Sequence, residues 1–291
     1  MKNAKLKVIS FILTVAMVVA LLPAATLFAA SNWSFDSKTK TLTIAYAGEM
    51  PEFTSLTTRP WDTYSKTTEK IVIKNGITAI SAIAFANFHN VKEVVWPTDG
   101  KLKTIGNSAF YCCCDLKSVT IPNGVTTIGS FAFEDCESIS KLTFPKTLKT
   151  IGQCAFAVDY GGDMKYTSLS IPSSVTTIGA YAFYNNSNLK SITGGSGLVT
   201  IGHHAFYKCS KLATFKISSK KLKTIGSYAF AGCKKLKTIY IQKTTKLTKK
   251  TVKSSLKSSS VKTVKVKKTK VSAYKKFFTK GNCGRKVTVK K

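Results

Sequence analysis

The chain has 291 residues, and its 45 Lys and Arg residues outnumber its 13 Asp and Glu residues to give a formal net charge of +32 at pH 7. All 13 acidic residues precede Met164, whereas the stretch from Met164 to Lys291 has 29 Lys and Arg residues and no acidic residue. This composition excludes a carboxylate-based catalytic or metal site from the C-terminal half and favours anionic partners for it.

The N-terminal segment from Met1 to Ala30 has the order of a secretory signal peptide. Lys2, Lys5 and Lys7 come first, and an uncharged apolar run follows that ends in Pro23 and a cluster of small residues. A membrane anchor is the alternative, because the run from Val8 to Ala30 is long enough to span a bilayer. Pro23 and the Ala-Ala-Ser ending favour cleavage near Ala29 to Ser31. We therefore expect residues 1–30 to be removed and the protein to be exported.

Residues 31–70 are predicted to form an N-terminal β-hairpin cap. In WSFDSKTKTLTI, Trp33 and Phe35 precede a polar turn from Asp36 to Lys40, and Leu42 and Ile44 follow it. Apolar residues alternate with polar ones on both sides of the turn, which is the pattern of a hairpin.

The phrase TIGxxAF recurs, with small variations, through the middle of the chain. Its phenylalanines follow one another at nearly regular intervals: Phe85, Phe110, Phe133, Phe156, Phe183, Phe206 and Phe230. A period of roughly 20 to 29 residues with apolar residues at fixed offsets is typical of a leucine-rich-repeat solenoid. We predict about seven repeats of roughly 23–27 residues over residues 71–241, in an α/β horseshoe-like solenoid with end caps.

Each repeat divides into two extended pieces and a turn. In LKSVTIP, Leu116 to Pro122, apolar and polar residues alternate as in a half-buried strand, which ends at the proline because proline has no N–H. A second short piece such as VTTIG ends at a glycine, and AF then opens a short helical turn whose phenylalanine points into the coil. The fold is therefore mainly short parallel β-strands with short helical turns, and stacked repeats share a continuous core.

The pattern L-x-x-V-x-I-P-x-x-V-T-x-I-G-x-x-A-F-x-x-C-x-x-L resembles the BspA-type leucine-rich repeat over about Ile71 to Ile241. The flanking segments WSFDSKTKTLTIAYAGEMPEF and YKKFFTKGNCGRKVTVKK also resemble the ends of such proteins. The resemblance implies an exported bacterial protein, secreted or at the cell surface, whose curved solenoid acts in adhesion or protein binding.

Residues 242–291 are predicted to form a Lys-rich degenerate repeat and a C-terminal cap. SSVKTVKV, Ser259 to Val266, predicts a strand, VSAYKKFF a short amphipathic helix, and RKVTVKK a last strand. Terminal repeats of solenoids are expected to be atypical, because they cover the exposed end of the core.

Four of the eight cysteines occupy one column of the repeat, the third residue after the phenylalanine. Leucine-rich repeats commonly place a buried Cys or Asn in this column, where it packs against or hydrogen-bonds to the loop backbone. The expected structural column consists of Cys113, Cys136, Asn186, Cys209 and Cys233, with Phe88 and Asp159 at its other positions.

Cys112 and Cys114 fall in neighbouring columns that hold mostly polar residues. We expect them to be exposed, oxidisable thiols, either free or in disulfides with one another or with a partner chain. A zinc site is disfavoured, because three adjacent cysteines cannot close a tetrahedron and no second pair accompanies them.

No pattern in the chain predicts catalysis. His203 and His204 are adjacent and face different directions, and no carboxylate follows Asp163 to pair with them. GxSxG, HExxH and phosphate-binding glycine loops are missing from the sequence. We expect no catalytic residue, no metal and no cofactor.

A row of lysines is the main binding signal. Lysine recurs after the first apolar residue of the principal strand, and stacking places this position along the strand face. The predicted binding residues are Lys92, Lys117, Lys190, Lys216, Lys237, Tyr240, Lys262 and Lys265. A cationic stripe attracts polyanions; the alternative is that these lysines only solubilise the face and protect it from aggregation.

The predicted function is therefore binding or adhesion through the strand face, with no membrane span after the signal peptide. The partner is expected to be a protein or glycan with anionic groups: a cell-wall polymer, a sulfated glycan or a matrix protein. Specific nucleic-acid binding is disfavoured because Arg59 and Arg285 are the only arginines. Non-specific polyanion binding and a structural scaffold without a ligand of its own are the alternatives.

Overall fold

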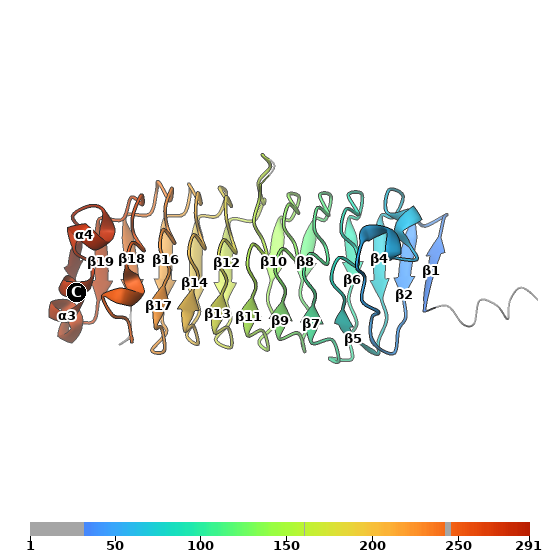
Figure 1. Cartoon of the computed structure of the whole chain (residues 1–291), viewed down its shortest axis with the longest axis horizontal. Helices are drawn as coiled ribbons and strands as arrows, with labels where there is room; N and C mark the ends of the chain where they lie inside the picture. The colour runs from blue at the N-terminus through green and yellow to red at the C-terminus, as the bar shows by residue number, and fades with distance from the viewer. Residues whose placement is uncertain (1–31, 160, 242–245) are drawn as a thin grey trace, which may run out of the picture. The chain divides into compact units, whose positions relative to one another are not determined.

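The computed structural model describes residues 32–159, 161–241 and 246–291. The predicted signal peptide lies outside the described residues. Contacts divide the chain after Ser34, and the repeats stack within the unit formed by residues 35–291 (Figure 1).

Principal strands of neighbouring repeats pair in parallel from Thr41–Ile44 onward, and this pairing is interrupted at two places along the stack. Along these strands buried and outward residues alternate, as in β12, where Leu169 and Ile171 are buried while Ser168 and Ser170 are exposed. In the described residues, the principal strands form three sheets: β1 (Trp33–Asp36), β2 (Thr41–Ile44), β4 (Lys70–Ile73), β6 (Glu93–Val95); β8 (Ser118–Thr120), β10 (Lys141–Thr143); and β12 (Ser168–Ile171), β14 (Ser191–Gly194), β16 (Thr214–Ile217), β18 (Thr238–Ile241), β19 (Thr263–Val266), β20 (Thr288–Lys290).

The second extended piece of each repeat builds one continuous sheet. Its Thr-Ile pairs lie in register from coil to coil, as in Thr150↔Thr177 and Ile151↔Ile178, with the isoleucine buried and the threonine half-buried. This eight-stranded sheet contains β3 (Gly48–Glu49), β5 (Ile77–Ile80), β7 (Thr104–Ile105), β9 (Thr127–Ile128), β11 (Thr150–Ile151), β13 (Thr177–Ile178), β15 (Thr200–Ile201) and β17 (Thr224–Ile225) (Figure 1).

The segments that contain the Ala-Phe pair are short hydrogen-bonded turns and do not extend into helices. Residues with positive φ interrupt them, as Tyr181 and Asn185 do at φ 56° on either side of Phe183. A left-handed residue cannot continue a right-handed helix. The described helices lie near the ends instead: η2 (Leu56–Thr58), η3 (Asp62–Tyr64), η4 (Lys250–Val252), η5 (Lys268–Lys270), α3 (Val271–Phe277) and α4 (Lys280–Cys283).

The leucine-rich-repeat solenoid has about nine turns, more than the seven that the TIGxxAF phrase indicated. The additional turns lie at the ends, where the phrase is lost but the coil continues. At the N-terminal end Trp61 takes the place of the phenylalanine: it is fully buried, stacks on Phe85 at 6.0 Å, and donates from Nε1 to the Ala84 carbonyl at 2.9 Å. At the other end β19 and β20 extend the principal sheet without a phenylalanine column.

The repeat phenylalanines form a stack through the core. Neighbouring ring centroids are 5.1 to 5.6 Å apart from Phe85 to Phe230, and every ring of the stack is fully buried. Offset rings at this spacing attract one another beyond the gain from burial. The stack therefore fixes the register of the coils.

The coil between Phe156 and Phe183 is the longest of the series, and it breaks the regular pattern. In the described part of the chain β10 has only β8 as a hydrogen-bonded neighbour, and β12 begins a separate sheet. The described residues of the connection from β11 to β12 extend beyond the neighbouring turns (Figure 1).

Among the described residues no helix is both long enough and apolar enough to cross a bilayer.

The glycine that ends each TIG phrase allows close contact between coils. A Cβ at Gly152 would lie 2.5 Å from the Gly129 carbonyl carbon and 2.6 Å from its oxygen, so Gly152→Ala forces the backbones apart. We expect the free energy of unfolding in urea to fall by about 2 kcal/mol or more.

Gly281→Ala is the matched control, because its Cβ would meet no atom nearer than Thr279 Oγ1 at 4.0 Å. Its stability should stay within about 1 kcal/mol of wild type. Equal losses in the two variants would contradict the close approach at Gly152.

Candidate functional site

The strand face of the C-terminal coils carries two outward rows. In the first row every member has a hydroxyl group; Ser168, Ser191 and Thr214 are in register, as are Thr238, Thr263 and Thr288. In the second row Lys216 pairs with Tyr240, Tyr240 with Lys265, and Lys265 with Lys290. We call these four residues the Lys–Tyr ladder.

Tyr240 lies between two ammonium groups of the Lys–Tyr ladder. Lys216 Nζ is 5.5 Å and Lys265 Nζ 5.6 Å from the centroid of its ring, both within cation–π range. Tyr240 and Lys265 also line a hollow of about 240 Å³ together with Lys267 and Lys291. The hollow therefore combines an aromatic ring with several cations, and the sequence has no Asp or Glu side chain after Asp163.

Four further lysines of the predicted row lie at the edge of the strand face rather than within the strands. Each directly precedes the principal strand, and each is exposed: Lys117, Lys190, Lys237 and Lys262. Lys237 donates from Nζ to the Lys234 carbonyl at 3.1 Å. These residues widen the cationic surface next to the Lys–Tyr ladder.

Lys92, also predicted as a binding residue, is paired. Its Nζ lies 2.7 Å from Glu69 Oε2, and Lys40 Nζ lies 2.6 Å from Glu69 Oε1. Hydrogen bonds from Lys40 and Lys92 lower the pKa of Glu69 to about 2. Lys70 and Glu93 form a similar pair in the same coils, at 3.1 Å. Lys92 therefore differs from the other predicted binding lysines, because a carboxylate of the preceding coil already pairs with it; its part in binding stays a prediction.

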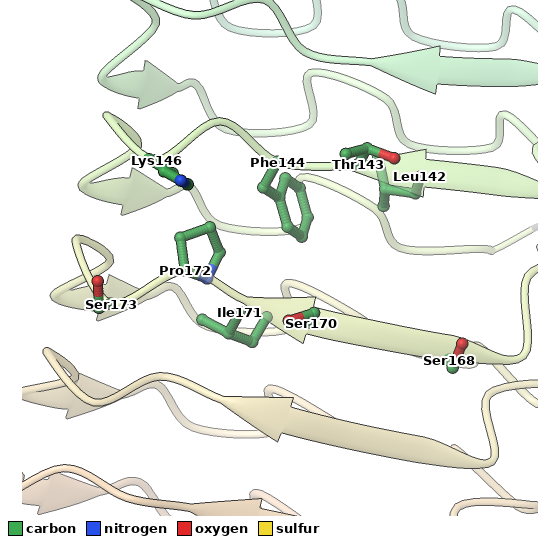
Figure 2. A pocket seen from close by; sticks show the side chains of 9 residues that line it. All are labelled: Leu142, Thr143, Phe144, Lys146, Ser168, Ser170, Ile171, Pro172 and Ser173. Atoms are coloured by element: carbon green, nitrogen blue, oxygen red, sulfur yellow. The ribbon is translucent and has the colours of Figure 1, made fainter.

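The break between β10 and β12 opens a pocket of about 600 Å³ on the strand face (Figure 2). Phe144 lies opposite Ile171 and Pro172 across the gap between the two coils (Figure 2). The polar lining consists of hydroxyl groups and one ammonium group: Thr143, Ser168, Ser170, Ser173 and Lys146. A concave site with an apolar floor and a few polar groups is the usual form of a ligand pocket.

Sequence reasoning missed this gap. Phe144 and Ser170 occupy ordinary positions in their repeats, and nothing in their identity marks a pocket. The available signal was the longer interval between Phe156 and Phe183, which places extra residues directly before β12.

The structural column is buried and bonded to the phenylalanine column. Each cysteine is fully buried, and its Sγ donates to the carbonyl of the phenylalanine one coil earlier: Cys113 to Phe85 at 3.3 Å, and Cys136 to Phe110, Cys209 to Phe183 and Cys233 to Phe206 at 3.1 Å each. Asn186 does the same through Nδ2, at 2.7 Å from the Phe156 carbonyl. Asp159 is exposed instead, and its column position is lost in the irregular coil.

Cys112 and Cys114 are half-buried, not fully exposed as the sequence predicted. The reason is that neighbouring turns cover them: Cys114 Sγ lies 3.5 Å from His89 Nδ1 and 3.4 Å from the Cys112 carbonyl. Burial raises the pKa of Cys112 to about 12 and that of Cys114 to about 11. None of the eight cysteines forms a disulfide in this structure.

His203 and His204 belong to a row of rings. His204 stacks on Tyr181 at 4.7 Å and on Tyr228 at 5.2 Å, and its Nδ1 lies 3.2 Å from Nδ1 of His203. Burial and the neighbouring His203 lower the pKa of His204. Within the described ranges no group of three or more His, Cys, Asp or Glu side chains is placed to hold a metal ion.

Thiol labelling checks this placement of the cysteines. In the folded, reduced protein at pH 7, Cys113, Cys136, Cys209 and Cys233 should stay unmodified by an alkylating reagent. Cys112 and Cys114 should react slowly and then faster as the pH rises toward 11, because the thiolate is the reactive form. Peptide mapping by mass spectrometry measures the rates, and equal rates at all six sites would contradict the column.

The family model described as the BspA type leucine rich repeat region matches residues 63–159 and 160–283, with six copies. No curated protein matches this chain significantly.

Three solved structures illustrate the similarity. A leucine-rich repeat protein from Bacteroides ovatus is 21% identical, with a TM-score of 0.52 over 89% of this chain and 74% of that one. The T. pallidum leucine rich repeat protein is 18% identical, with a TM-score of 0.46 over 74% and 90%. A leucine rich cell surface protein from Faecalibacterium prausnitzii is 19% identical, with a TM-score of 0.32 over 89% and 92%. At these identities the likeness concerns the fold, and only the first of these three scores exceeds 0.5.

The six matched copies cover most of the chain, and the stacked parallel strands agree with them. The chain therefore belongs to the BspA-type leucine-rich-repeat family.

Proposed function

We propose that this protein is an exported, non-enzymatic adhesion module of the bacterial surface, and that the strand face of its C-terminal coils binds an anionic polymer. The partner is a cell-wall polymer, a sulfated glycan or an acidic matrix protein. Membership of a family of leucine-rich-repeat surface proteins supports a binding role, and such solenoids are generally not enzymes.

The Lys–Tyr ladder is the observation that carries this proposal. Its residues repeat once per coil along a parallel sheet, so their spacing is set by the strand separation of roughly 4.8 Å. A polyanion laid along the coils meets a cation or an aromatic ring at each step. The charges remain available because no acidic residue follows Asp163, whereas the described ion pairs all lie within residues 40–93.

The gap between β10 and β12 adds a reason to favour a glycan. Its hydroxyl groups donate and accept hydrogen bonds, as sugar hydroxyls require, and Lys146 lies at its rim. The hydroxyl row from Ser168 to Thr288 continues from the gap to the Lys–Tyr ladder. A sulfated or phosphorylated glycan therefore finds hydroxyl and cationic partners along one face.

The proposal assigns different tasks to parts of the chain. Residues 1–30 direct export, residues 31–70 cap the solenoid of residues 71–241, and the Lys-rich residues 242–291 close it and contribute to the anionic partner's site. The neutral N-terminal coils are left for a protein ligand. None of these parts needs a cofactor.

A charge-matched pair of variants tests the proposal. Lys216→Gln/Lys265→Gln removes two cations from the strand face, while Lys149→Gln/Lys223→Gln removes two exposed cations that directly precede strands of the second sheet. Binding of the full-length protein to immobilised heparin is measured from about 50 mM to about 500 mM NaCl.

We expect the first variant to lose about tenfold in affinity at low salt and to show a salt slope smaller by about 2, because each lysine releases roughly one counterion. The second variant should bind as wild type does. Equal losses would favour non-specific polyanion binding, and no loss in either variant would favour a scaffold without its own ligand; both results contradict the proposal.

A further inference from the structure

A second concave site lies on the turn side of the irregular coil, away from the strand face. This cleft of about 440 Å³ is formed by turns that follow β9, β11, β13 and β15. We call it the turn cleft, and its main lining residues are Glu134, Gln153, Cys154, Ala157, Tyr181 and Tyr184.

The turn cleft exists because two rows of side chains contain a small residue at the same coil. The row directly after the repeat phenylalanine is Ala86, Tyr111, Glu134, Ala157, Tyr184, Tyr207 and Ala231. Backbone hydrogen bonds hold this row in step, as from Val158 N to the Tyr184 carbonyl at 3.0 Å and from Asp135 N to the Ala157 carbonyl at 3.0 Å. Ala157 thus leaves open the space between Glu134 and Tyr184, which are two coils or roughly 10 Å apart.

The second row, two residues before the phenylalanine, has the same interruption. Tyr181, His204 and Tyr228 stack face to face at 4.7 and 5.2 Å, and Cys154 stands where the stack would continue toward Phe131. Burial raises the pKa of Cys154 to about 12, so this thiol is part of the wall and not a nucleophile at neutral pH.

The aromatic side of the turn cleft is formed by rings in mutual contact. Tyr184 stacks on Tyr207 at 5.6 Å and meets Tyr181 edge to face at 5.9 Å. Lys208 fixes the pair from outside: its Nζ lies 5.5 and 5.6 Å from the two stacked rings and donates to Tyr184 Oη at 3.3 Å. Because the stack ends at Tyr184, one face of its ring borders the cleft.

The opposite side carries an unused carboxyl group. The Glu134 residue is 7% exposed, and none of the hydrogen bonds or ion pairs among the described residues uses its side chain. Burial, together with the charges of Asp135 and Asp159, raises the pKa of Glu134 to about 7. A carboxyl group in this state both donates and accepts hydrogen bonds near neutral pH. The side chain lines the cleft, so a bound ligand can reach its carboxyl group.

We propose that the turn cleft binds a neutral sugar ring of a glycan chain. A sugar ring presents C–H groups on its faces and hydroxyl groups around its rim. The C–H face packs on the electron-rich face of Tyr184, and the hydroxyls reach Glu134 and Gln153. Glu134 and Asp159 repel anions. A cationic ligand is disfavoured because Lys208 already contacts the Tyr184 and Tyr207 rings.

This site goes beyond the proposed function, because it lies off the strand face, has the opposite charge and requires no salt-sensitive contact. The Lys–Tyr ladder attracts polyanions, whereas the turn cleft selects uncharged sugar. A surface glycan that has both neutral and anionic segments would engage the two sites independently.

The test measures binding of neutral hexasaccharides of glucose, mannose, galactose and N-acetylglucosamine to the full-length protein by calorimetry. At least one should bind, with an affinity that does not change between low and high salt. Ala157→Tyr fills the cleft with a residue that the same row already accepts at Tyr184 and Tyr207, and it should weaken binding by at least about tenfold. Heparin binding should persist in this variant, which separates this site from the strand face.

Ala231→Tyr is the matched control, since it adds a tyrosine to the same row outside the cleft and should bind as wild type does. Tyr184→Ala removes the sugar platform and provides a second test should Ala157→Tyr not fold, as judged by circular dichroism; it too should lose about tenfold. Glu134→Gln keeps a hydrogen-bonding group, so its affinity for the hexasaccharide should fall less than that of Glu134→Ala. The proposal is overturned if no hexasaccharide binds, if Ala157→Tyr and Tyr184→Ala both bind normally, or if tetramethylammonium binds in place of the sugars.

Discussion

The bond between the structural column and the phenylalanine column is the constraint on which the rest of this protein depends. Each buried turn leaves a phenylalanine carbonyl inside an apolar core, and an unpaired buried carbonyl is costly. A thiol or amide from the next coil satisfies it, as Cys136 does for Phe110 and Asn186 for Phe156. Because this bond and the ring stack both act between adjacent coils, each coil is positioned by its neighbour, and the strands of successive coils come into register as a consequence.

Where this hydrogen bond is missing, the solenoid has a concave site on each of two sides. The long coil after Phe156 places the exposed Asp159 at the column position, and Tyr166 fills the interior and hydrogen-bonds to Asn186 instead. On the strand face β10 and β12 are not paired and the pocket lies between them; on the turn side Cys154 and Ala157 leave the cleft. One irregular repeat thus accounts for both concave sites, and it lies where the charge of the chain changes from neutral to strongly cationic.

The repeat, its core residues and the buried column were predictable because each position recurs at a fixed offset. At the C-terminal end the segments SSVKTVKV, VSAYKKFF and RKVTVKK predicted β19, α3 and β20. The N-terminal coil was not predictable in this way, because Trp61 replaces the phenylalanine and no phrase marks it. The pairing of Lys92 with Glu69 had a usable signal, since the two residues lie one repeat length apart in the sequence. For the gap and the turn cleft, the only signal was the longer interval after Phe156. This interval shows that the coil has extra residues, but it does not show on which side of the solenoid they lie.

The central claim is that ligand binding is concentrated on the C-terminal strand face. Hydrogen–deuterium exchange of the full-length protein with and without a heparin oligosaccharide maps this directly, because amides beneath a bound chain exchange more slowly. The account predicts added protection in β16, β18 and β19 and none in β2, β4 and β6. Protection spread evenly over all coils, or concentrated in residues 40–93, would contradict it.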